Sequence, residues 1–149
     1  MFIMGKVIEI GVHKSHGDKV TSVKIAEALQ GKGLLHNNHF KENNDKKCQL
    51  TLIEIENINY YNNLTNNNIQ AINFRRNIIT EGIKLNGLVG KEFFVGSIKV
   101  KGHDLCRPCK YLENKLVKND IVKLLLLKSG LRCEILSSGK ISVGDIIKY

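Results

Sequence analysis

A series of short segments with alternating or β-branched apolar residues, separated by glycine-containing turns, constrains the fold more than any other feature of this chain. Alternation with a period of two is typical of strands that have one buried face. The segments are residues 5–12, 20–29, 48–55, 92–95, 98–100, 131–136, 141–143 and 145–147. Many short strands with few helices predict a mainly β fold, in the form of a closed or nearly closed β-barrel.

Two further stretches have helical spacing of apolar residues. Residues 54–64 are predicted to form a short helix, and residues 120–128 are predicted to form the best helix in the chain. Residues 37–47 are almost wholly polar and are predicted to be a mobile loop. We find no internal repeat and no linker, so residues 1–149 are expected to form a single domain.

The chain is strongly basic, with a net charge of +9 and a pI near 9.4. Such a surface attracts anions, although the Lys, Asn and Ile bias of an A/T-rich genome would give the same excess. The lysines are scattered and only 6% of residues are aromatic, which argues against a nucleic-acid partner. The sequence has neither a secretion signal nor an apolar run long enough to span a bilayer. We therefore expect a cytoplasmic location, no membrane partner and reduced cysteines.

The segment Gly102-His103-Asp104-Leu105-Cys106-Arg107-Pro108-Cys109 holds two of the four cysteines. Pro108, the single proline of the chain, stiffens the loop, and the charge of Arg107 favours a reactive thiolate. Cys106 and Cys109 have the spacing of a redox pair or of half a zinc site, but the flanking strands and the isolated Cys48 and Cys133 supply neither arrangement. Two ordinary buried thiols are the remaining alternative.

Two other clusters are candidates for binding. Arg75 and Arg76 form a pair suited to a bidentate clamp on phosphate or carboxylate, although a solvated basic turn gives the same pattern. Four histidines form two His-x-x-His pairs, which lack a nearby acid or cysteine to complete a metal site: His13 with His16, and His36 with His39. Nucleotide-binding loops and nucleophile elbows are absent from the sequence.

Taken in order, these segments match a known arrangement. The matching pieces are the glycine-rich segment ending in His39, Leu52-Ile53-Glu54, Phe74-Arg75-Arg76-Asn77-Ile78, Gly82-Ile83-Lys84-Leu85-Asn86, Leu88-Val89-Gly90, Leu105-Cys106-Arg107-Pro108-Cys109, Gly130-Leu131-Arg132-Cys133-Glu134-Ile135 and Gly144-Asp145-Ile146-Ile147. The chain resembles a standalone MOSC domain, the molybdenum cofactor sulfurase C-terminal domain. The resemblance implies a barrel-like fold, the molybdenum cofactor (molybdopterin) as ligand, and sulfur handling by a cysteine.

The resemblance also implies roles for residues of this chain. Cys109 corresponds to the key thiol, which would ligate molybdenum as the metal site or hold a persulfide, and Cys106 is the extra thiol of short members. The anion-recognition segment corresponds to Arg75, Arg76 and Asn77, while His39 ends the glycine-rich loop and Arg107 would help keep the thiol ionised. The family often has Gly-Asp ahead of that histidine, whereas this chain has Asn37-Asn38, which weakens the case for metal binding in the loop.

The leading hypothesis is therefore a cofactor-binding or sulfur-carrier module. One alternative is a molybdenum-dependent reductase of N-hydroxylated compounds that works with a separate electron donor, and another is a non-catalytic anion-binding module. Whether the protein is an enzyme stays open. The expected partners are the cofactor or its biosynthetic enzymes, with a sulfur donor or an electron-transfer protein. Pyridoxal phosphate is not expected, because 149 residues leave no room for a fused desulfurase domain.

Overall fold

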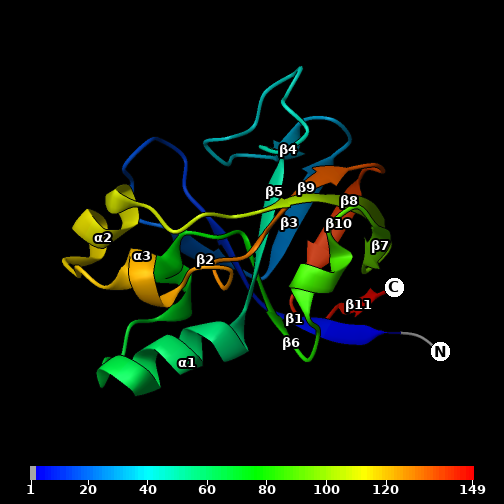
Figure 1. Ribbon diagram of the computed structural model, residues 1–149. Coiled ribbons are helices and arrows are strands. Elements are labelled where there is room, and N and C mark those ends of the chain that lie inside the picture. Colours follow the sequence, from blue (N-terminus) through cyan, green and yellow to red (C-terminus); the bar gives the residue numbers. More distant parts are fainter. Residues whose placement is uncertain (1–2) are drawn as a thin grey trace.

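A computed structural model describes residues 3–149, and its strands close into a seven-stranded barrel (Figure 1). Around the barrel the order is β11, β7, β8, β9, β5, β6 and β1, and β1 pairs again with β11 to complete the circle. The barrel strands are β1 (Met4–Val12), β5 (Leu50–Glu54), β6 (Ile78–Glu81), β7 (Glu92–Val95), β8 (Ile98–Leu105), β9 (Leu131–Ile135) and β11 (Ile146–Lys148). The first and last strands of the chain are therefore neighbours, so no long sheet edge is left between them.

Smaller strands extend this barrel. Strand β2 (Thr21–Val23) pairs with the end of β1, and a three-stranded sheet is formed by β10 (Gly139–Ser142), β3 (Ile25–Leu29) and β4 (Gly33–Leu34). Two 3₁₀ turns, Ala71–Phe74 and Leu85–Leu88, flank β6. Helices α1 (Ile55–Thr65), α2 (Lys110–Leu116) and α3 (Ile121–Leu124) gather at one side of the barrel (Figure 1).

Strands β5 and β6 form a parallel pair, whereas the other neighbouring strands of the barrel run antiparallel. A parallel pair needs a crossover connection, and α1 with the first 3₁₀ turn supplies it. Both strands are buried on both faces, as expected beneath a crossover helix. Leu52 and Ile78 face the barrel interior, while Ile53 and Ile79 pack in a second cluster with α1 residues such as Ile58.

The structure confirms the mainly β, barrel-like fold with a few short helices. The expected strand over 20–29 is interrupted at Lys24, because β2 pairs with β1 whereas β3 joins the small sheet. The expected helix over 120–128 is wrong beyond Leu124, where α3 ends. Leu126 and Leu127 are exposed, and Leu127 has a positive φ of 62°, which is incompatible with a continuing helix. Helix α2 was not foreseen. None of the helices within residues 3–149 combines the length and apolar character that crossing a bilayer requires.

Candidate functional site

A cleft of about 280 Å³ opens where the loop after β8 meets the loop before β5. All seven residues singled out from the sequence line it: His39, Arg75, Arg76, Asn77, Cys106, Arg107 and Cys109. Five more residues complete the lining: His13, Lys47, Cys48, Thr51 and Arg132. Arg132 lies in one of the matching sequence segments, but Lys47, Cys48 and Thr51 carry no motif, so only the fold brings them to the cleft.

The two closely spaced cysteines occupy different environments. Cys109 is exposed and directly precedes α2, whose first turn begins with the Glu113 N–H donating to the Cys109 carbonyl at 3.2 Å. Cys106 is only 3% exposed, and its N–H donates to the Gly130 carbonyl at 2.7 Å. Burial raises the pKa of the Cys106 thiol, although the charges of Arg76 and Arg132 oppose that shift. Cys109 is therefore the member of the pair that a ligand can reach.

Gly130 explains why Cys106 lies so close to the barrel. It has a φ of +111°, and an added Cβ would overlap the carbonyl oxygen of Leu52 on β5. A glycine is required here because other residues rarely adopt this backbone and because the strand leaves no space for a side chain. The close approach lets the Gly130 carbonyl accept the Cys106 N–H and so fixes the start of the cysteine loop.

The paired arginines are held by different parts of the fold. Arg76 donates from Nε to the carbonyl of the buried Ser129 at 2.8 Å and from Nη2 to its Oγ at 2.9 Å. Arg75 ends a 3₁₀ turn with a φ of 63°, and its Nη1 donates to the Asp18 carbonyl at 2.9 Å. Its guanidinium also lies over the ring of Tyr111, 5.9 Å from the centroid. Both guanidinium groups are thus held at the cleft by the fold rather than displayed on a free basic turn.

Asn77 connects the arginine segment to two barrel strands. Its Oδ1 accepts hydrogen bonds from the N–H and hydroxyl of Thr51 at 3.1 and 3.2 Å, and its Nδ2 donates to the Gly11 carbonyl at 3.1 Å. The side chain is buried, with 8% of its surface exposed. In this structure the amide is engaged by the protein itself, so Asn77 holds the floor of the cleft in place.

Two histidine rings line the cleft edge to face, with centroids 5.8 Å apart: His13 and His39. Desolvation lowers the pKa of both, and so do nearby cations, chiefly Arg75 for His13 and Arg132 for His39. Both rings are therefore neutral near pH 7. The His-x-x-His pairs themselves are divided, since His16 lies beside Tyr111 instead. No group of three or more His, Cys, Asp or Glu residues in the described part of the chain is arranged to hold a metal ion.

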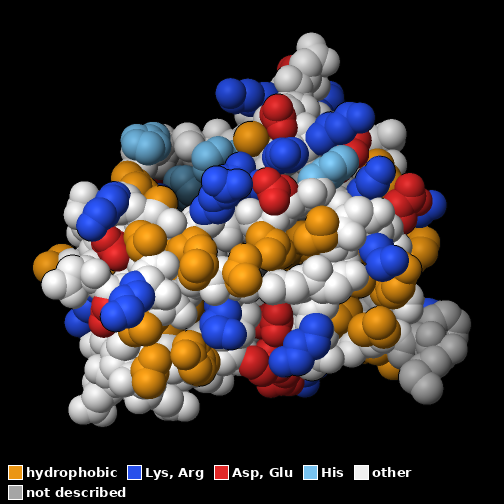
Figure 2. Space-filling view, viewed as in Figure 1, with side chains coloured by type: hydrophobic (Ala, Val, Ile, Leu, Met, Phe, Trp, Pro, Cys, Tyr) orange, Lys and Arg blue, Asp and Glu red, His pale blue; other side chains and the backbone are white. Residues whose placement is uncertain are grey.

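The cleft is strongly electropositive. Five cationic side chains line it, and none of the twelve lining residues is an acid: the cations are Lys47, Arg75, Arg76, Arg107 and Arg132. Figure 2 shows many Lys, Arg and His side chains across the upper part of the visible face, with a few acidic side chains among them. Cations that converge on a concave surface concentrate anions there, so the lining fits a ligand with several negative charges.

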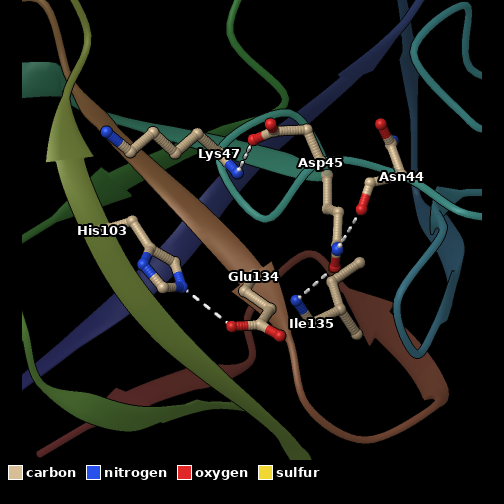
Figure 3. A network of polar contacts seen from close by, with 7 residues as sticks. Asn44, Asp45, Lys47, His103, Glu134 and Ile135 are labelled. Atoms are coloured by element: carbon tan, nitrogen blue, oxygen red, sulfur yellow. Dashed lines mark hydrogen bonds and ion pairs between the residues drawn. The ribbon is translucent and has the colours of Figure 1, made fainter.

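A polar network beside the cleft orders the loop that the sequence predicted to be mobile (Figure 3). Asn44 donates through Nδ2 to the carbonyls of Lys32, His39 and Cys48, at 2.8, 2.6 and 3.3 Å. The buried Gln49 continues the network to β9, because its Oε1 accepts the Ile135 N–H at 2.8 Å. The loop is therefore tied to the barrel and presents its side chains at a defined edge of the cleft.

Comparison with known proteins identifies the family of this chain and agrees with its fold. The MOSC domain family matches residues 22–148, and the chain belongs to this family. The family is associated with the molybdenum cofactor. No curated protein matches the sequence.

Solved structures share the fold at low sequence identity. The YuaD protein from Bacillus subtilis is 15% identical with a TM-score of 0.85, and the alignment covers 99% of this chain and 96% of that one. YiiM from Geobacillus stearothermophilus is 20% identical with a TM-score of 0.78, over 98% of this chain and 75% of that one. YiiM from Escherichia coli is 18% identical with a TM-score of 0.71, over 99% and 68% of the two chains. At these identities the likeness concerns the fold.

Proposed function

We propose that the cleft binds the molybdenum cofactor and that Cys109 provides the thiolate which ligates molybdenum or carries a sulfane sulfur. The observation that supports this most is the exposed Cys109 in a cleft lined by five cations and no acid. A thiolate suits a soft metal or a persulfide, and the cations suit an anionic tail. Bound there, the cofactor would supply a redox-active soft metal held by a dithiolene.

The residues present fit such a ligand in chemistry. Arg76 is fixed by two hydrogen bonds to Ser129, so it offers a preorganised guanidinium for a phosphate group. Arg75 and Arg107 add charge at the rim, and Arg132 adds charge beside Cys106. The neutral His13 and His39 contribute hydrogen-bonding rings that do not neutralise the anion.

As a sulfur carrier, Cys109 would exchange sulfur without net oxidation. Its thiolate attacks the terminal sulfur of a donor persulfide, a new sulfur–sulfur bond forms at Cys109, and the donor leaves as a thiolate. The exposure of Cys109 supports this role, since a protein donor must reach the sulfur. The cleft offers five cationic side chains to the negatively charged groups that meet in this exchange.

The test is to express the protein in a host that makes the cofactor and to measure molybdenum, pterin and persulfide on the purified chain. We expect bound pterin or persulfide in the wild type, with loss of molybdenum or persulfide in Cys109→Ser and loss of pterin in Arg76→Ala. Lys128→Ala is the matched control, because Lys128 lies over the Tyr60 ring and not among the residues lining the cleft. Absence of both pterin and persulfide from every preparation would refute the proposal.

The same preparations separate the two alternatives. Turnover of hydroxylamines with an artificial electron donor, lost in Cys109→Ala, would identify a reductase. Binding of an anionic ligand that survives Cys109→Ser but fails in Arg76→Ala would identify a non-catalytic anion-binding module.

A further inference from the structure

Three cysteines line the cleft, and they differ in how far a reactant can reach them. Cys48 and Cys109 are both exposed, whereas Cys106 is buried with 3% of its surface exposed. Spacing in the sequence pairs Cys106 with Cys109, and it leaves Cys48 isolated. In the fold, the two thiols open to a reactant in this small cavity are Cys48 and Cys109.

The backbone of Cys48 is fixed by its own loop. Its N–H donates to the Asp45 carbonyl at 3.0 Å, and its carbonyl accepts a hydrogen bond from Asn44 Nδ2 at 3.3 Å. Asp45 also accepts the Lys47 N–H through Oδ1 at 2.8 Å (Figure 3). These bonds hold the backbone of Cys48 on a short turn just before β5, and the residue lines the cleft.

An ion pair ties this turn to the strand that leads into the cysteine loop. Lys47 Nζ lies 3.7 Å from Asp104 Oδ2, and Asp104 is on β8, two residues before Cys106. The segment that carries Cys48 and the segment that carries Cys109 are therefore anchored to each other beside the cleft. Exposed ion pairs contribute little to stability, and this one shows that the two thiol-bearing segments approach each other beside the cleft.

We propose that Cys48 is the resolving thiol of this site and that it forms a reversible disulfide with Cys109 across the cleft. The proposal rests on the proposed function in its sulfur-carrier form. It assigns the working pair to the two exposed thiols and makes Cys106 a structural residue.

The reaction balances without an external oxidant. The Cys48 thiolate attacks Sγ of the Cys109 persulfide, a Cys48–Cys109 bond forms, and the bond between Sγ and the terminal sulfur breaks. The electron pair leaves with the terminal sulfur, which keeps its proton and departs as hydrosulfide. The disulfide returns to two thiols when a dithiol reductant donates two electrons and two protons.

The surroundings favour Cys48 over Cys106 as the attacking group. Cys48 is exposed to the cleft, and Lys47, Arg107 and Arg132 line the same cleft, where positive charge favours the departure of an anion. Burial raises the pKa of Cys106, which keeps that thiol protonated. A protonated, enclosed thiol is a poor nucleophile.

The test uses the reduced full-length protein and inorganic polysulfide as the persulfide-forming probe. We expect the wild type to release hydrosulfide and to yield a linked Cys48–Cys109 peptide on non-reducing digestion and mass spectrometry. We expect Cys48→Ser to keep the extra sulfur atom on Cys109 and to lose hydrosulfide release. Cys106→Ala removes the thiol that the sequence spacing pairs with Cys109, and this variant should still release hydrosulfide and yield the linked peptide.

A second arm makes the result independent of persulfide loading. Diamide, a thiol oxidant, is added to the wild-type protein, and the linked peptides are mapped; a Cys48–Cys109 peptide supports the pairing. A Cys106–Cys109 peptide, or the absence of a Cys48–Cys109 peptide, overturns the proposed pairing. Hydrosulfide release that persists in Cys48→Ser overturns it as well. If diamide links Cys48 to Cys109 but polysulfide adds no sulfur to any variant, the sulfur-carrier function fails while the thiol pair stands.

Discussion

Removing the Asn77 side chain should lower the free energy of unfolding far more than removing an exposed polar side chain would. Asn77→Ala deletes three side-chain hydrogen bonds, two part-buried ones with Thr51 and a buried one to Gly11, and leaves the Thr51 N–H and the Gly11 carbonyl without that partner. At about 1 kcal/mol for each bond, the free energy of unfolding should fall by about 3 kcal/mol. For a chain of this size the melting temperature should fall by roughly 10 °C.

The assay is urea unfolding followed by circular dichroism. Asn119→Ala is the matched control, because Asn119 is exposed and its loss should change the free energy of unfolding by less than about 0.5 kcal/mol. Asn77→Ala with wild-type stability would refute the reasoning, since it would mean that the three bonds add nothing over hydration of the same groups.

Asn77→Asp provides a second check through pH. Burial of the new carboxyl beside the Gly11 carbonyl raises its pKa, whereas the Thr51 donors and the cations of the cleft lower it. We expect burial to dominate and the folded pKa to lie above the unfolded value. Its neutral form can donate to Gly11 and its charged form cannot. The stability of this variant should therefore be greatest below the unfolded pKa and fall as the pH rises through the raised folded pKa. Equal destabilisation at all pH values would contradict this account.

Two further predictions concern the cleft. Gly130→Ala should lower the free energy of unfolding by about 3 kcal/mol, because the added Cβ meets the Leu52 carbonyl and the backbone has a positive φ. Urea unfolding measures this loss, and an unchanged unfolding midpoint would contradict the prediction. The lowered pKa of His13 predicts that the unfolded state binds a proton first as the pH falls below about 6.5, so stability falls there. His13→Gln should flatten that part of the stability profile, and an unchanged slope would count against it.

The local sequence predicted a strand correctly where the alternation of apolar and polar residues matches the buried and exposed faces of that strand. The strands near 5–12, 48–55 and 131–136 were predicted close to their observed bounds, because alternating residues on a barrel strand face either the core or the outside. The failures have a tertiary cause. Residues 20–29 were predicted to form one strand, but its two halves pair in two different sheets. Leu126 and Leu127 were predicted to be helical, but both side chains are exposed.

The sequence by itself predicted the mainly β class from local residue patterns, and the family resemblance then singled out seven residues that line the cleft. Only the tertiary structure decided how the cysteines differ. Cys106 is buried at the end of β8, where its N–H bonds to Gly130, whereas Cys48, far away in the sequence, shares the cleft with Cys109. Exposure and proximity arise when distant strands close into a barrel, and no local pattern encodes them. The same closure turns Asn77 inward, where it joins β1 and β5 beneath the arginines.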